Sequence, residues 1–177
     1  MTMSQPEPSV SVTPDLLRRL DALEAEGVVR RIMAECLEAG DANDGAKVAA
    51  LFTTDGVWEA VGPLAALLGT HRGPEAIARR YSVDVHPMSF SRHFLTNEVI
   101  TVNGDGAAGA WRFLQTGTIQ GQALWGSGSY RADFVRVEGH WKMKHLRVEN
   151  FFATPYEDGW AKTPFPRPSD GTQTTHR

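Results

Sequence analysis

The segment FSRHFLTNEVITVNGDGAAG, residues 90–109, has the pattern of two strands around a tight turn. β-forming side chains stand on both sides of residues 103–106, whose Asn-Gly and Asp-Gly pairs are strong hairpin signals. Similar segments follow, separated by the turn sequences QGQ and VEGH. The pattern predicts four long strands in series, at residues 90–102, 107–119, 123–137 and 140–153. Strands joined in series by short turns form an antiparallel sheet.

The main helical signals lie before this β-rich region. Thr13-Pro14-Asp15 combines a capping hydroxyl, a proline suited to the first helical position and an acid for the first turn. Apolar residues at helical spacing continue to Leu37. We expect Gly27 to separate two helices, and the polar, glycine-rich residues 40–45 to end the second.

Shorter elements connect these helices to the strands. A short helix should carry Val48 into the core, residues 57–61 predict a strand, and residues 62–73 (GPLAALLGTHRG) predict a loop. Pro74 and Glu75 then open another helix. Helices first and a β-meander afterwards predict an α+β domain in which a curved antiparallel sheet wraps the helices on one face.

Composition narrows the class of protein. A chain of 177 residues with 41% hydrophobic and 22% charged residues is typical of one globular domain with its own core. We expect a disordered polar leader at residues 1–12, the folded domain at 13–153 and a C-terminal tail at 154–177. The net charge of −3 and the lack of a basic stripe argue against a nucleic-acid partner.

The single cysteine, Cys36, cannot form an internal disulfide, which favours a reducing, cytoplasmic location. The N-terminus lacks the pattern of a signal peptide, and no run of about 18 apolar residues occurs, so we expect a soluble protein without a membrane partner. The sequence contains no GxGxxG, Walker, CxxC or HExxH motif. We therefore expect neither a cofactor nor a metal ion.

The order of these elements resembles the SnoaL-like branch of the nuclear-transport-factor-like superfamily. The resemblance runs from about Leu23 to Phe152 and rests on EAGDANDGAKVAALFTTDGVWEAVG, RGPEAIARRY and SRHFLTNEVITVNGDGAAG. It implies a cone-shaped fold in which a curved sheet encloses helices and leaves a deep apolar pocket at its open end. Enzymes of this branch include scytalone dehydratase, bile acid dehydratase, hexachlorocyclohexane dehydrochlorinase, polyketide cyclases and relatives of ketosteroid isomerase.

The resemblance also implies a catalytic pair, His93 and Asp41. In the dehydratase and dehydrochlorinase group, a histidine at the start of the strand after the GPE helix pairs with an aspartate just past the long N-terminal helix. Asp41 would then accept the proton on Nδ1 of His93 and leave Nε2 to take a proton from substrate. From the residues alone, His93 is better interpreted as a hydrogen-bonded core residue, Asp41 equally as a turn residue, and Asp44 as a helix cap.

Cys36 marks a departure from the family pattern. Many family dehydratases carry a tyrosine five residues before the aspartate, and this chain has a cysteine there. A thiol replaces that phenol poorly, so its loss favours simple proton abstraction with a self-sufficient leaving group. Packed as a small hydrophobic residue, Cys36 would line the core or the pocket.

Further candidates for substrate contact come from the strands. With Cys36, the candidates are Trp58, Asn97, Trp111, Trp125, Tyr130, Arg147 and Asn150. The aromatic residues would serve equally as pocket walls or as core, and Asn97 could order the pocket entrance or sit in a bulge. Arg147, if it points inward, would select a carboxylate. Alternation places Arg147 opposite Leu146, Val148 and Asn150, and the apolar set favours the core face. Four histidines in polar or turn contexts, His71, His86, His140 and His176, are expected on the surface.

These observations predict a cofactor-independent lyase, a dehydratase or related elimination enzyme, acting on a small hydrophobic cyclic or aromatic substrate. One alternative is an isomerase or polyketide-type cyclase that uses the same two residues. Another is a non-catalytic ligand-binding member or the small subunit of a ring-hydroxylating dioxygenase. The resemblance also implies a homo-oligomer, a dimer or trimer formed through the outer face of the sheet.

Overall fold

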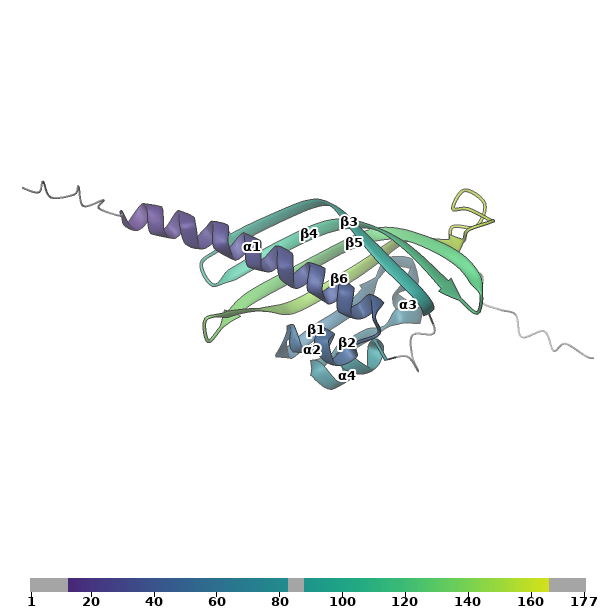
Figure 1. Cartoon of the computed structure of the whole chain (residues 1–177), viewed down its shortest axis with the longest axis horizontal. Coiled ribbons are helices and arrows are strands. Elements are labelled where there is room, and N and C mark those ends of the chain that lie inside the picture. Colours follow the sequence, from purple (N-terminus) through teal and green to yellow (C-terminus); the bar gives the residue numbers. More distant parts are fainter. Residues whose placement is uncertain (1–12, 83–87, 166–177) are drawn as a thin grey trace, which may run out of the picture.

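A computed structural model describes residues 13–82 and 88–165 of the chain. Its sheet has six strands in the order β2-β1-β6-β5-β4-β3. The last four in sequence are β3 (Met88–Asn103), β4 (Gly106–Ile119), β5 (Gln122–Val137) and β6 (His140–Pro155), and each is antiparallel to the next. They confirm the predicted meander, with every boundary within two residues. The curved α+β architecture is also confirmed (Figure 1).

The other edge of the sheet differs from the prediction. β1 (Phe52–Val61) pairs parallel to β6, so the sheet is mixed, and β2 (Thr70–Arg72) pairs antiparallel to β1. The predicted loop at 62–73 is wrong, because it holds a 3-10 turn η1 (Gly62–Leu64), the short helix α3 (Ala65–Leu68) and β2. The Pro-Leu-Ala-Ala-Leu-Leu run favours a helical turn, and the edge of β1 supplies backbone partners for the three residues of β2.

One long helix, α1 (Pro14–Asp41), lies against the concave face of the sheet (Figure 1). The Thr13 side chain caps it by accepting a hydrogen bond from the Leu16 amide. The predicted break at Gly27 is wrong. One glycine costs a helix only about 1 kcal/mol, and the buried residues Ala25 and Val29 hold the helix against the sheet on both sides of it.

Two short helices pack against each other near the C-terminal end of α1 (Figure 1). α2 (Gly45–Ala50) begins at Asp44, whose side chain accepts a hydrogen bond from the Lys47 amide, so the predicted cap is confirmed. α4 (Gly73–Arg80) packs against α2 so closely that a Cβ on Gly45 would lie 2.1 Å from the carbonyl oxygen of Ala78. Glycine is therefore required at this contact.

The first part of the C-terminal tail packs on the outer face of the sheet. Trp160 lies 4.7 Å from Trp125 and 5.1 Å from Phe152 between ring centroids. The expected leader at 1–12, the end of the tail from 166, and His86 and His176 lie outside the described residues. His140 is exposed, as expected. Within the described ranges, no helix has the length and apolar character needed to cross a membrane.

Candidate active site

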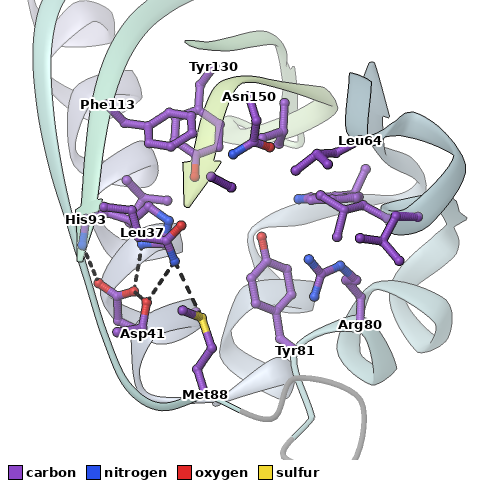
Figure 2. Close-up of a pocket in the computed structure, with 18 of the residues that line it drawn as sticks. Leu37, Asp41, Leu64, Arg80, Tyr81, Met88, His93, Phe113, Tyr130 and Asn150 are labelled. Carbon is purple, nitrogen blue, oxygen red and sulfur yellow. Dashed lines mark hydrogen bonds and ion pairs between the residues drawn. The ribbon is translucent and has the colours of Figure 1, made fainter. Parts of the chain in front are cut away.

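A cavity of about 500 Å³ opens between the end of α1, α4 and the inner face of the sheet. Its volume is in the range of cavities that hold small organic ligands. Most of its wall is apolar or aromatic, contributed by Leu37, Trp58, Leu64, Leu67, Leu68, Met88, Phe113, Ile119, Leu124, Tyr130, Val148 and Ala153. The polar groups are fewer, and two sets of them lie on opposite sides of the cavity (Figure 2).

Asp41 and His93 form the first polar group. Nδ1 of His93 lies 2.7 Å from Oδ1 of Asp41, and the His93 backbone amide donates to Oδ2 at 2.9 Å. Ser91 Oγ donates to Oδ1 at 2.6 Å. Asp41 is the last residue of α1, while Ser91 and His93 alternate onto the inner face of β3. The helix end thus meets one strand face, which brings residues 52 positions apart into contact (Figure 2).

This network fixes the proton arrangement. Burial opposes charge on Asp41, but the hydrogen bonds and attraction of His93 and the hydrogen bond from Ser91 outweigh it, so the pKa of Asp41 lies below its usual 3.8. An ionised carboxylate only accepts hydrogen bonds, so Nδ1 of His93 must be the donor. Nε2 is then the nitrogen left to accept a proton from a ligand. Gln115, which lies opposite His93 on β4, donates to Ser91 Oγ at 3.1 Å and so extends the network to a second strand.

Aromatic rings surround the imidazole. Phe113 lies 5.8 Å and Tyr130 lies 6.2 Å from His93 between ring centroids, and the side chain of His93 is 14% exposed. Burial raises the pKa of Tyr130 well above its usual value, and burial likewise raises that of Tyr81 on the opposite wall. Both phenols therefore stay protonated and can donate a hydrogen bond. Figure 2 shows both hydroxyl groups directed into the cavity.

Arg80 and Tyr81, at the end of α4, form the second polar group (Figure 2). The guanidinium carbon of Arg80 lies 4.8 Å from the Trp58 ring centroid and 5.6 Å from that of Tyr81. Its Nε is buried without a hydrogen-bond partner, and no carboxylate of residues 13–82 or 88–165 forms an ion pair with it. The preceding Arg79 points elsewhere, because adjacent helical residues diverge by about 100°, and pairs with Glu75 at 3.1 Å.

The structure places three of the predicted contact residues, Trp58, Tyr130 and Asn150, in the wall of this cavity together with His93 and Asp41. It does not place the other five there. Cys36 is fully buried on the core face of α1, and Trp111 is buried beside Phe134.

The remaining three residues face away from the cavity. Asn97 has φ of 52° at a bulge in β3, which fits the alternative that it is a bulge residue. Trp125 alternates to the outer face under the tail aromatics. Arg147 also points outward and pairs with Asp133 at 2.9 Å and with Glu59 at 3.3 Å. The apolar set of β6 is the core face, as alternation predicted.

Five polar cavity residues were missed by the sequence interpretation: His71, Arg80, Tyr81, Ser91 and Gln115. The surface assignment of His71 is wrong, because β2 pairs with β1 and sets this ring 5.5 Å from Trp58. Its Nε2 lies 2.9 Å from the Leu68 carbonyl oxygen. Ser91 could have been found from the alternation that places it on the same strand face as His93. No sequence motif marks Arg80 and Tyr81, at the end of α4, as cavity residues.

No three histidine, cysteine, aspartate or glutamate side chains converge in a metal-binding arrangement among the described residues.

Comparison with known proteins shows the fold and the family. Solved structures that resemble the chain include hexachlorocyclohexane dehydrochlorinase LinA-type3 from Novosphingobium barchaimii, at 22% identity and TM-score 0.70, covering 85% of this chain and 99% of that one. A protein from Novosphingobium aromaticivorans assigned as an aromatic ring hydroxylase has 24% identity and TM-score 0.67, covering 77% and 96%.

An NTF2-like protein with a cystatin-like fold from the same species has 21% identity and TM-score 0.67, covering 87% of this chain and 96% of that one. At these identities the likenesses show the fold alone, and their assigned activities differ. The sequence matches no curated protein. The model of the SnoaL-like domain family matches residues 21–147, which is more than half of the chain. The chain therefore belongs to the SnoaL-like domain family.

Proposed function

We propose that the protein is a lyase in which His93, oriented by Asp41, removes a carbon-bound proton from a small hydrophobic cyclic or aromatic substrate. The observation that carries this proposal is the 2.7 Å contact between His93 Nδ1 and Asp41 Oδ1 in the wall of an apolar cavity. A buried carboxylate that holds one imidazole nitrogen makes the other a positioned general base.

The proposed step needs only side chains of this chain. Nε2 of His93 takes the proton, the C–H electrons form a double bond, and the leaving group departs from the neighbouring carbon with its bonding electrons. Asp41 stabilises the imidazolium that forms. The hydroxyl of Tyr81 or Tyr130 can donate a hydrogen bond to a departing hydroxide or halide, because both phenols remain protonated.

The similarity to a hexachlorocyclohexane dehydrochlorinase supports elimination as the reaction class. Hexachlorocyclohexane is therefore the first compound to test, together with other cyclic chlorides and with cyclic β-hydroxyketones. Chloride release and product mass would identify the compounds that the wild-type protein converts.

His93→Gln should lower turnover of any such compound by about 100- to 10,000-fold, the usual contribution of a general base. Glutamine keeps a similar polar bulk and can donate a hydrogen bond from its amide, so the variant should remain folded, which its thermal unfolding curve checks. A folded His93→Gln variant with near-wild-type turnover would disprove the mechanism.

An isomerase is the second candidate, and the two phenols favour it. Tyr81 and Tyr130 both point into the cavity that holds His93, and neutral phenol donors can stabilise the enolate that proton abstraction from a ketone produces (Figure 2). Elimination releases a second molecule, whereas isomerisation conserves the mass of the substrate. Mass spectrometry of the product therefore separates the two reactions.

A further inference from the structure

We propose that Arg80 makes this cavity selective for an anionic substrate, an apolar cyclic or aromatic acid whose carboxylate pairs with the guanidinium group. The place of this contact in catalysis rests on the proposed function, but the binding itself does not. The carboxylate would lie at the α4 wall, with the ring of the acid extending toward His93 on the opposite wall (Figure 2).

The first support is the surroundings of the Arg80 side chain. Its guanidinium carbon lies over the rings of Trp58 and Tyr81, 4.8 and 5.6 Å from their centroids, which holds the group at the cavity wall. A guanidinium held by cation–π contacts keeps N–H groups free for a ligand, and two of them match the two oxygens of a carboxylate. Because Nε is already buried without a partner, its desolvation cost falls on the free protein and not on the binding step.

The second support is the charge balance of the cavity wall. Its one carboxylate is Asp41, which faces Arg80 from the far side and is fully engaged by Ser91 and His93. Arg147, the arginine that the sequence indicated as a carboxylate ligand, is neutralised on the outer face by Asp133 and Glu59. Among the described residues, a counter-charge for Arg80 is therefore missing inside the cavity, and a ligand carboxylate would supply it.

The apolar remainder of the wall sets the rest of the ligand. Leu64, Leu67 and Leu68 line the cavity together with Trp58, and Phe113 and Tyr130 lie near His93. Such a surface gains free energy by covering a hydrocarbon ring and pays to desolvate additional polar groups. A ligand with one carboxylate and an otherwise apolar ring fits both features.

Isothermal titration calorimetry at constant ionic strength tests the proposal. Benzoate, cyclohexanecarboxylate and 1-naphthoate would be compared with their uncharged amides, which have nearly the same shape. The wild-type protein should bind at least one carboxylate about tenfold or more tightly than its amide, as a charged hydrogen-bonded pair contributes. Arg80→Gln should abolish this difference and leave the amide affinity unchanged, while Arg80→Lys should retain part of it.

Arg79→Gln is the matched control, since Arg79 is the adjacent arginine, is exposed and does not line the cavity. It should bind like the wild type. Equal affinity of wild-type protein for carboxylates and amides, absence of carboxylate binding, a preference that survives in Arg80→Gln, or an equal loss in Arg79→Gln would each overturn the proposal. The first two outcomes use no variant, so they hold even if Arg80→Gln unfolds.

His93→Gln separates this proposal from the lyase mechanism. If both are right, the variant keeps the carboxylate preference and loses turnover. Turnover that persists in His93→Gln would refute the proton-abstraction mechanism and leave the Arg80 contact standing. If turnover requires His93 but the protein shows no preference for carboxylates over amides, the Arg80 proposal is refuted and the proton-abstraction mechanism stands.

Discussion

Replacing Asp41 with asparagine removes the charge of the buried carboxylate while keeping its shape. An asparagine oxygen in the Oδ1 position could still accept from Ser91 and from Nδ1 of His93. The amide nitrogen would then face the His93 backbone N–H, which now donates to Oδ2 at 2.9 Å. Two donors would meet there, and one hydrogen bond to a charged group would be lost.

The loss of that bond should cost about 1.5–3 kcal/mol of unfolding free energy. For a domain of this size, 1 kcal/mol corresponds to about 2–4 °C, so the unfolding temperature should fall by about 3–12 °C. Turnover should fall further, on the order of 100- to 10,000-fold, because a neutral amide does not supply the negative charge that stabilises the imidazolium. Thermal unfolding followed by circular dichroism and kcat/KM on an identified substrate measure the two effects.

Asp44→Asn is the control for the same chemical change. Asp44 is a partly exposed helix cap, and asparagine caps a helix about equally well, so the unfolding temperature should stay close to that of the wild type, with unchanged turnover. The reasoning would be refuted if Asp41→Asn kept kcat/KM within about threefold of the wild type, or if both variants changed equally.

Three further predictions concern stability and reactivity. Because the folded-state pKa of Asp41 lies below 3.8, its contribution is fully present above that pH and is lost as the pH falls through the lowered pKa. Urea unfolding at a series of pH values should therefore show the stability gap between wild type and Asp41→Asn closing below pH 3.8, whereas a constant gap would contradict this. Burial raises the pKa of Cys36 to about 12, so iodoacetamide should leave the native thiol unmodified and alkylate it in urea. Rapid native alkylation would show an accessible thiol. Gly45→Ala should destabilise the protein by about 3 kcal/mol through the clash with Ala78, while Gly27→Ala should stabilise it by about 0.5–1 kcal/mol. A higher unfolding temperature for Gly45→Ala than for Gly27→Ala would contradict the close packing of α2 against α4.

The meander could be predicted from the sequence because its information is local. The Asn-Gly and Asp-Gly turn and the alternation along each strand specify β3 to β6 within short windows. The parallel pairing of β1 with β6 could not, since it joins segments some 90 residues apart that carry no register signal. The predicted helix break at Gly27 was wrong for a related reason. The glycine weakens the helix locally, but the tertiary packing of Ala25 and Val29 stabilises it.

The candidate site divides in the same way. The pairing of His93 with Asp41 came from resemblance to a family, because nothing local joins two residues so far apart. Arg147 illustrates the limit of alternation. The two faces of β6 could be separated from the sequence, and the apolar face is the inner one. Arg147 was nevertheless chosen as a carboxylate ligand, and its side chain lies on the outer face, paired with Asp133. Arg80 and Tyr81 depend on the direction of α4, which only the packed structure supplies.

The imidazole of His93 offers the most direct test of the central claim, that Asp41 holds Nδ1 protonated and leaves Nε2 free to accept a proton. Nitrogen-15 NMR of uniformly labelled protein, followed upward in pH until the ring signals stop changing, resolves the two ring nitrogens of the neutral imidazole, and the signal lost in His93→Gln assigns them. We predict a protonated Nδ1 and an unprotonated Nε2 for the neutral ring of the wild type. A protonated Nε2 with a bare Nδ1 would contradict the account.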